Sequence, residues 1–350
     1  MTASQEAKAP ARAGAGARAD LAAARVKRAE VADVARIARW VVAKVMYASA
    51  PVSVMFRLAT WRGSIDARLC VGADQVRATV ERHLTPAGAD EARRVTARFF
   101  QFRWRAAFVR LWPQIRGFAG AEEIDVVGLE HLDAALARGK GAVLVTAHFG
   151  YPRLIKPVLR RHGYDVLLSG KVATPSQRRD VPPGFTRLGA AVHRKLLRLP
   201  IWWRFDERWQ RAVAADLAAT LNVRPHLAAL ARNRAVVLVA DGGSAVAASA
   251  SIFGIDVAMS SAPFSIARAS GAAALPVFAV DTLETYGPRA VRLRIHPPLS
   301  LQSSDDEAAD RAVNVRRFAG VYEQEAHLYP HNWQWSWIRD GRFRTRREDR

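Results

Sequence analysis

Short apolar runs alternate with helix-like segments through the chain after residue 120. The apolar runs predict strands at Ala142–Ala147, Asp165–Ser169, Ala235–Ala240, Ala274–Val280 and Ala290–Ile295. The segments between and after them predict helices at Leu129–Ala137, Tyr151–Arg161, Pro225–Arg232, Pro263–Ser270 and Glu307–Leu328. This alternation is typical of α/β folds, and we predict a mixed central sheet flanked by helices.

The preceding stretch, residues 31–118, has apolar and aromatic positions at helical spacing. Within it, Trp40–Trp61 is mostly apolar, but Lys44, Pro51 and Arg57 interrupt it, so it is a poor candidate for a membrane-spanning helix. Tryptophan at both ends suits a segment that lies in the interface of a bilayer. The alternative is an ordinary pair of core helices broken at Pro51. We predict an N-terminal helical membrane-anchoring segment.

The chain therefore divides into four predicted regions. Residues 1–30 form an Ala/Arg-rich tail without aromatic residues, which we expect to be disordered. Residues 31–118 form the helical, membrane-interfacial region, residues 119–343 form the α/β domain, and residues 344–350 form a basic tail. The polar start of the chain does not match a cleavable signal peptide.

Composition narrows the possible partners. The 350 residues include 53 Lys and Arg against 32 Asp and Glu, a net charge of +21, and half of them are hydrophobic. That apolar content excludes a disordered chain, and a single cysteine, Cys70, excludes an internal disulfide framework and a Cys-rich zinc site. The positive surplus calls for a polyanionic partner, either nucleic acid or an anionic lipid surface.

The charge is concentrated in the middle of the chain. Residues 153–211 hold fourteen Lys and Arg against four Asp and Glu. Within this stretch, Arg187–Arg211 interleaves cations with Leu, Ile and three tryptophans, which suits an anionic membrane surface because basic residues attract lipid headgroups and Trp favours the interface. The alternative is a solvated basic helix with ordinary core tryptophans.

Three stretches carry candidate chemistry. In the first, Gly128–Gly150, a helix and a buried strand lead to His148 at the carboxyl end of the strand, where ligands bind in open α/β sheets. In the second, a strand ends at Asp241, and a loop rich in Ala and Ser leads to Phe253-Gly254 and a helix start at Ser261-Ala262-Pro263. In the third, Tyr329–Phe343, tryptophans alternate at 333, 335 and 337, which fits a strand face, an aromatic core plug or an interfacial belt.

Over about Ile124–Phe343 these blocks, in this order, resemble the lipid A biosynthesis (lauroyl/myristoyl) acyltransferases of the lysophospholipid acyltransferase superfamily. The resemblance implies transfer of a fatty acyl chain from a thioester, on acyl carrier protein or coenzyme A, to a hydroxyl of a lipid or glycolipid acceptor in lipid A-type biosynthesis. It implies a location on the cytoplasmic face of the inner membrane and no cofactor or metal. It also assigns general-base catalysis to His148 and a catalytic role to Asp241, with substrate contacts from Phe149, Gly150, Arg153, Phe253, Gly254 and Ser261.

The chain departs from this family at the acid of the catalytic motif. The family's motif is His-(four residues)-Asp/Glu, in which the acid orients the imidazole and stabilises its protonated form, and this chain has Arg153 at the place of the acid. Three possibilities follow. Another carboxylate, Asp241 or Asp165, orients His148; or His148 works unaided; or the fold survives as an inactive lipid-binding or regulatory protein.

The competing class is a basic nucleic-acid-binding protein. The chain has no helix-turn-helix, zinc-finger or RNP-like signature, and Asp241-Gly242-Gly243-Ser244 lacks the spacing of the nucleotide-binding fingerprints. It also lacks a Gly-x-Ser-x-Gly elbow and zinc-protease histidine pairs. We therefore expect an anionic membrane surface rather than nucleic acid as the partner.

Overall fold

The computed structural model describes residues 30–31, 33–34, 50–70, 72–84, 88–109, 120–169, 191–192, 195, 217–218, 223–241, 247–335 and 344–345. The chain forms two compact units. In the unit of residues 1–49 and 173–211, the described positions are 30–31, 33–34, 191–192 and 195, all helical. Several sequence predictions concern residues outside the described ones. These are the predictions for the N-terminal tail up to residue 29, for 40–49, for the basic segment 187–211 apart from three positions, and for most of the C-terminal tail.

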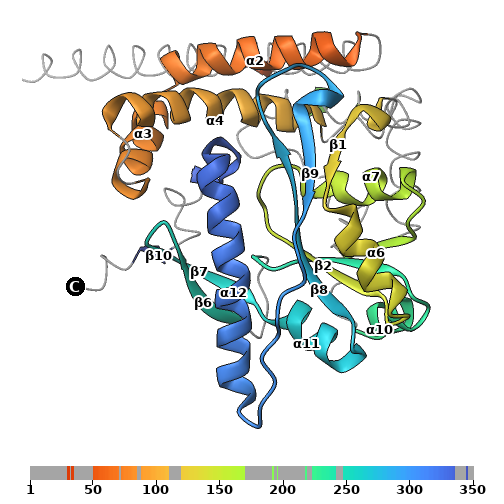
Figure 1. The fold of residues 1–350 in the computed structure, drawn as a ribbon. Helices are drawn as coiled ribbons and strands as arrows, with labels where there is room; N and C mark the ends of the chain where they lie inside the picture. The colour runs from red at the N-terminus through yellow and green to blue at the C-terminus, as the bar shows by residue number, and fades with distance from the viewer. Residues whose placement is uncertain are drawn as a thin grey trace, which may run out of the picture. The chain divides into compact units, whose positions relative to one another are not determined.

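The second unit, residues 50–172 and 212–350, is built on a central mixed sheet (Figure 1). Its described strands lie in the order β1-β9-β8-β2-β5-β3-β4. Their bounds are β1 Asp125–Val127, β2 Ala142–Thr146, β3 Val166–Ser169, β4 Leu217–Ala218, β5 Ala235–Val239, β8 Ala273–Asp281 and β9 Val291–Ile295. The strands from β8 to β4 run parallel, and β9 is antiparallel to β8. The predicted mixed sheet is thus confirmed.

Helices cover both faces of this sheet. The helices after β1 and β2, α6 (Leu129–Ala137) and α7 (Ile155–Arg161), contact one face of it, with α7 following a 3-10 turn, η2, at Pro152–Leu154. The opposite side chains of β2, Val143 and Val145, share a core with α10 (Arg224–Ala231), α11 (Ala262–Ser270) and α12 (Glu307–Leu328). Helix α12 begins at Asp306, whose carboxylate accepts the backbone N–H groups of Ala308 and Ala309, as expected for a helix N-cap.

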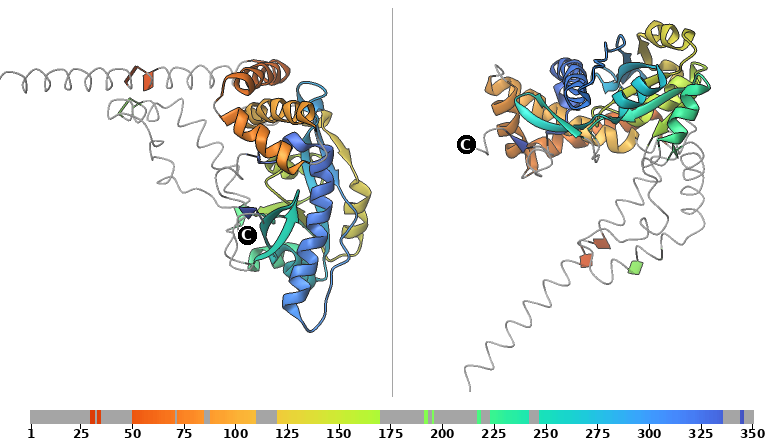
Figure 2. Two further views of the ribbon diagram at one scale, coloured as in Figure 1. Left: turned by 90° about the vertical axis from the view of Figure 1, so that its left-hand side faces the viewer. Right: turned by 90° about the horizontal axis from the view of Figure 1, so that it is seen from below.

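The segment after Asp241 differs from the sequence prediction. Instead of a loop up to Phe253-Gly254, β6 (Ala247–Ile252) and β7 (Ile255–Ser260) form an antiparallel hairpin that lies beside α12 (Figure 2). A short strand, β10 (Arg344–Thr345), pairs with β7. The pattern of Ala and Ser gave little signal for strands because Ala has low β-propensity and Ser is not among the residues enriched in strands. The hairpin is instead held by the burial of Ile252, Val257 and Met259 in the core.

Three helices occupy the described residues between 50 and 109. They are α2 (Val52–Leu69), which begins directly after Pro51, α3 (Gly72–His83) and α4 (Ala89–Val109). At Gly63 of α2, a Cβ atom would collide with the backbone of Gln101 in α4. The close contact between α2 and α4 therefore depends on the absence of a side chain at this position. Val80 of α3 and Phe99 of α4 belong to the same core as the strands of the sheet. In the described part of the chain no helix is both long and apolar enough to cross a bilayer, and membrane anchoring stays a prediction.

The structure decides between the three interpretations of the tryptophan-rich segment Tyr329–Phe343. Trp333 and Trp335 are fully buried, whereas Trp337 lies outside the described residues. Trp333 packs on Tyr322 with ring centroids 5.0 Å apart, and Trp335 stacks on Phe253 at 5.6 Å. These two tryptophans therefore form an aromatic core plug, which closes the core beside the β6–β7 turn.

Candidate active site

His148 and Asp241 meet at one edge of the sheet. His148 follows β2 and Asp241 follows β5, and these two strands are parallel neighbours paired from Ala142–Ala235 to Thr146–Val239. Because the carboxyl ends of parallel strands lie at the same edge, the topology brings the two residues together across 93 positions of sequence.

The carboxylate of Asp241 makes three hydrogen-bonding contacts with His148. The Asp241 carboxylate accepts the backbone N–H of His148 at 2.8 Å (Oδ1) and 2.9 Å (Oδ2), and Oδ1 lies 2.8 Å from Nδ1 of the ring. A carboxylate at this distance holds the proton of the neutral imidazole on Nδ1, which leaves Nε2 as the basic nitrogen. The same arrangement orients the histidine of Ser-His-Asp triads.

Burial distinguishes the two partners. The side chain of Asp241 is 1% exposed, while that of His148 is 44% exposed, so the carboxylate lies beneath a ring that solvent and substrate can reach. Behind them lies Tyr322 of α12, which is fully buried. Burial, and to a lesser degree the negative charge of Asp241, raise the pKa of Tyr322 well above its usual value, so this phenol stays neutral.

The structure distinguishes between the two carboxylates proposed from the sequence. Asp165 is 65% exposed and pairs with Arg234 at 2.6 Å, whereas Asp241 bonds to His148. Arg153, at the place of the family's acid, is an exposed residue of η2. The carboxylate that orients His148 therefore comes from the neighbouring strand and not from the following turn.

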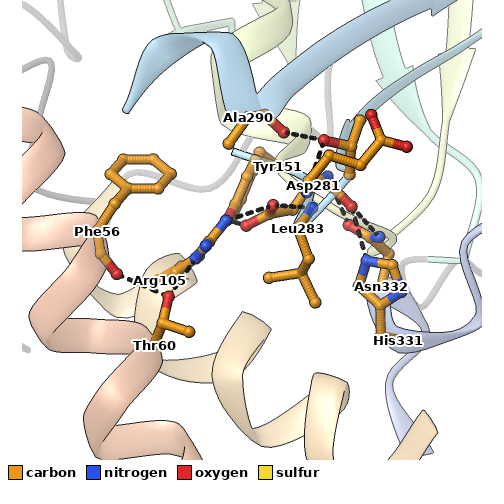
Figure 3. Close-up of polar contacts among 11 residues, drawn as sticks. Phe56, Thr60, Arg105, Tyr151, Asp281, Leu283, Ala290, His331 and Asn332 are labelled. Carbon is orange, nitrogen blue, oxygen red and sulfur yellow. Dashed lines mark hydrogen bonds and ion pairs between the residues drawn. The ribbon is translucent and has the colours of Figure 1, made fainter. Parts of the chain in front are cut away.

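A second buried aspartate, Asp281, lies on the other side of β2 from Asp241. Asp281 ends β8, which pairs with β2 in parallel, and its carboxylate bonds to Arg105 of α4 at 2.9 Å and to the hydroxyl of Tyr151 at 2.5 Å (Figure 3). Arg105 is held in turn by Thr60 of α2 at 2.7 Å. Burial raises the pKa of Asp281, and the positive charge of Arg105 opposes that rise.

The backbone of Asp281 is also fully bonded. Its N–H donates to Oδ1 of Asn332 at 2.9 Å, and its carbonyl accepts from the Asn332 amide at 2.9 Å and from Nε2 of His331 at 2.7 Å (Figure 3). We call the side chains of Thr60, Arg105, Tyr151, Asp281, His331 and Asn332 the Asp281 network. It joins α2, α4, β8 and the turn η4 (Pro330–Asn332).

This network also anchors the loop that carries His148. Tyr151 bonds to Asp281 through its hydroxyl, and its backbone N–H donates to the carbonyl of Ala279 at 2.6 Å. Gly150 donates to the carbonyl of Asn332 at 3.3 Å and has a φ angle of +62°. A Cβ at Gly150 would fall onto the carbonyl oxygen of Ala279, so only glycine fits this close approach.

The remaining predicted substrate-binding residues have different surroundings. Phe149 is fully buried and packs edge-on against Phe278 at 5.8 Å, so in this conformation its ring belongs to the core. Phe253 and Gly254 form the β6–β7 turn, packed against Trp335. Ser261, which is buried, precedes α11 next to Ser260, and Ser260 donates to the carbonyl of Ala240 at 2.6 Å. This bond places the start of α11 near Asp241.

Sequence reasoning missed the Asp281 network. Asp281 directly follows a predicted strand, as Asp241 does, and that shared position was the signal that could have identified it. Arg105 gave no signal, because a cation among aromatic residues of a helix usually lies on a solvated face. In the described part of the chain no group of three or more His, Cys, Asp or Glu side chains is placed to hold a metal ion.

Comparisons with known proteins bear on the activity at a general level. No model of a known protein family matches the chain. The chain is 26% identical over 280 residues to the phosphatidylinositol mannoside acyltransferase of Mycolicibacterium smegmatis, a stretch that covers 77% of this chain and 81% of that protein. This similarity suggests a lipid acyltransferase family and supports a lipid acyltransferase activity in general.

Proposed function

We propose that this protein is an O-acyltransferase in which His148 is the general base and Asp241 orients it. The observation that carries the proposal is the bond between Asp241 and Nδ1 of His148 at the joined ends of β2 and β5. A buried carboxylate under a partly exposed imidazole suits general-base catalysis, because it orients the ring and stabilises its protonated form. Asp241 thus provides His148 with a carboxylate partner although Arg153 occupies the place of the family's acid.

In the proposed reaction, His148 accepts one proton and later returns it. Nε2 of His148 takes the proton of the acceptor hydroxyl while the hydroxyl oxygen attacks the carbonyl carbon of an acyl thioester. Collapse of the tetrahedral intermediate breaks the C–S bond, and the imidazolium returns the proton to the departing sulfur. The products are the acyl ester and the free thiol. Asp241 stabilises the imidazolium between these two transfers.

The substrates in this proposal are an acyl thioester and a hydroxyl-bearing lipid. The relative's name describes action on a mannosylated inositol lipid, which favours a glycolipid acceptor for this chain as well. A lipid A-type disaccharide is the acceptor that the sequence resemblance suggests. The donor is acyl carrier protein or coenzyme A carrying the acyl chain, and either one is anionic, as suits a chain with a charge of +21.

We place the protein on the cytoplasmic face of the inner membrane, bound to an anionic lipid surface. The soluble thioester and the lipid acceptor can meet only at the membrane surface. A basic protein is attracted to that surface when its lipids are anionic. A nucleic-acid partner is the competing outcome, and it would show as steep salt-dependent binding to DNA or RNA without preference for anionic vesicles.

The test is the release of thiol from an acyl thioester that depends on a lipid acceptor. Palmitoyl-CoA and an acylated carrier protein serve as donors, and a phosphatidylinositol mannoside and a lipid A precursor serve as acceptors in detergent micelles. We expect His148→Ala to lower turnover by about 10²- to 10⁴-fold. His162→Ala, which changes an exposed histidine, is the matched control and should leave turnover unchanged.

Two further results decide the proposal. Asp241→Asn should lower turnover strongly, while Asp165→Asn, at the other carboxylate considered from sequence, should leave it unchanged. If wild-type protein binds the lipid acceptor but releases no thiol from either donor, the protein is an inactive lipid-binding member of this fold. If the wild-type and His148→Ala proteins turn over at equal rates, His148 is not the base.

A further inference from the structure

Helix α2 has apolar side chains on the face that points away from its own core. On one face, Met55, Phe56 and Gly63 are buried, and α2 packs there against α4, which separates α2 from the strands (Figure 1). A helix with one buried face is expected to be polar on the opposite face. In α2 the outer side instead combines several large apolar side chains with exposed arginines.

The outward apolar residues follow one helical stripe. They lie at spacings of four, three, four and four positions, which keeps them on one side of the helix: Val54, Leu58, Trp61, Ile65 and Leu69. Trp61 is 64% exposed, Leu69 is 78% exposed and Val54 is also exposed, while Leu58 and Ile65 are half-buried. We call this row the α2 stripe. A run of exposed large apolar side chains on one face marks an interaction site rather than ordinary surface.

Arginines flank the α2 stripe on both sides. Arg57 and Arg68 lie at one margin of it and Arg62 at the other, and all three are exposed. The helix has a single acid, Asp66, which bonds to Arg62 and to the indole of Trp104. An apolar band with cations along its margins matches a bilayer surface, where the apolar side chains enter the acyl region and the arginines reach the phosphates.

We propose that the α2 stripe is the surface by which this protein lies on an anionic phospholipid bilayer, with the axis of α2 parallel to the membrane plane. Charge decides between a membrane and a protein partner, because the stripe joins a Trp-containing apolar band to a surplus of two positive charges on one helix. The inference gives a surface to the membrane association proposed above, and it can fail while the acyltransferase proposal holds.

The lone cysteine of the chain gives a direct test. Cys70 is exposed and follows Leu69 at the end of α2, so a polarity-sensitive nitrobenzoxadiazole label on it reports on the stripe in the full chain. With vesicles of phosphatidylglycerol and phosphatidylcholine, we expect the label's emission to shift to the blue. The control carries the label on an introduced cysteine in Cys70→Ser/Leu328→Cys, at an exposed position of α12, and should show no shift.

Variants separate the apolar and charged contributions. Trp61→Gln/Leu69→Gln should weaken vesicle sedimentation by about tenfold or more, whereas Leu328→Gln, an equally exposed position elsewhere, should not. Arg57→Gln/Arg68→Gln should weaken it by about fivefold for each arginine removed, and the loss should disappear at high salt. Arg138→Gln/Lys140→Gln removes the same charge at an exposed turn and should have a much smaller effect.

Other outcomes contradict the inference. If the protein sediments with vesicles while the label at Cys70 stays in water, another basic surface holds the membrane. If Trp61→Gln/Leu69→Gln converts a dimer to a monomer without changing vesicle binding, the stripe contacts a second copy of this chain. Turnover on detergent-dispersed substrates should be unchanged in all α2 variants, which separates a failure here from a failure of the proposed catalysis.

Discussion

At the scale of single residues, two buried aspartates hold the loop after β2 from opposite sides. Asp241, at the end of β5, bonds to His148, and Asp281, at the end of β8, bonds to Tyr151 three residues later. Strand β2 lies between β5 and β8 in the sheet. The orientation of the His148 ring therefore depends on residues that are distant in the sequence and adjacent in the sheet.

The first prediction concerns how Asp241 and His148 act together. Asp241→Asn should lower kcat by about 10²- to 10⁴-fold, because an amide no longer fixes the Nδ1–H form of the ring or stabilises the imidazolium. Combining it with His148→Ala should cause no loss beyond that of His148→Ala alone, since the two residues act as one unit. Steady-state kinetics of the two single variants and the double variant check this. Losses that multiply would show that Asp241 acts independently of His148.

The second prediction concerns Arg153. This exposed cation lies on the same loop as His148, and we expect it to attract an anionic group of the donor or acceptor rather than to take part in proton transfer. Arg153→Gln should raise KM by about fivefold with kcat nearly unchanged, because an exposed ion pair contributes about 1 kcal/mol at most. Arg232→Gln, at an exposed helix end, is the control. A large fall in kcat would assign Arg153 a role in the reaction itself.

At the scale of elements, turns with left-handed backbone conformation shape the site. Gly150 and Gly254 have φ angles of +62° and +70°, but only Gly150 faces a neighbouring strand at the position of a Cβ atom. In the β6–β7 turn, Phe253 also has a positive φ of 53°, a strained conformation for a bulky residue. Its packing between Trp335 and His327 offsets this strain.

The third prediction compares the two glycines. Gly254→Ala should destabilise the protein by about 1 kcal/mol, the conformational cost of a left-handed alanine in open space. Gly150→Ala adds a collision with the carbonyl of Ala279 and should cost several times more, or displace the loop and abolish turnover. Denaturant unfolding and thiol release measured on both variants check this. Equal effects on stability and on turnover would mean that the loop at Gly150 can move freely.

At the scale of the whole unit, the Asp281 network ties the helical layer to the sheet. Arg105 and Asp281 are both completely buried, and they link α4 to the end of β8. A buried ion pair is not strongly stabilising in itself, but removing one partner leaves a buried charge without compensation. The network therefore makes the packing of α2 and α4 and the position of the His148 loop depend on one another.

The fourth prediction is a double-mutant cycle on this pair. Arg105→Met should lower the free energy of unfolding by about 3 to 5 kcal/mol, because it leaves Asp281 unpaired in the interior. Arg105→Met/Asp281→Asn should cost clearly less than the sum of the two single changes. Arg311→Met, which breaks an exposed pair with Glu307, is the control and should cost less than about 1 kcal/mol. Additive losses would show that the two charges do not interact.

The fifth prediction concerns acid stability. Burial lowers the pKa of His331 to about 4, and the nearby charges of Arg98 and Arg105 add to this effect. Between about pH 6.5 and pH 4 the unfolded chain binds a proton that the folded chain excludes, so stability is fully present above this range and falls as the pH decreases. From about pH 7 to pH 5 this residue should account for a loss of about 2 kcal/mol.

His331→Gln provides the comparison for this pH dependence. Glutamine can donate to the carbonyl of Asp281 as the imidazole does, but it does not titrate. Urea unfolding of both proteins at the two pH values should show a flatter dependence for the variant. Parallel curves would indicate that His331 takes up no proton on unfolding in this range.

The sequence was sufficient to predict the main elements of the unit. Strands β2, β3, β5, β8 and β9 and helices α6, α10, α11 and α12 lie within one or two residues of their predicted bounds. They were predictable because periodicity and capping residues are local properties of the chain. His148 and Asp241 were identifiable individually for the same reason, since each directly follows an apolar strand.

Only the tertiary structure decided which residues meet. The order of the strands places β2 between β5 and β8, and this order determines that Asp241 rather than Asp165 reaches His148 and that Asp281 reaches Tyr151. The β6–β7 hairpin and the buried Arg105 likewise depend on long-range packing. Small residues give no local signal for the hairpin, and nothing local distinguishes Arg105 from the other arginines of α4. The sequence alone identified His148 as the candidate base, because its place at a strand end is a local property of the chain. The partner carboxylate, Asp241, was decided by the order of the strands, because that order arises from contacts between distant segments.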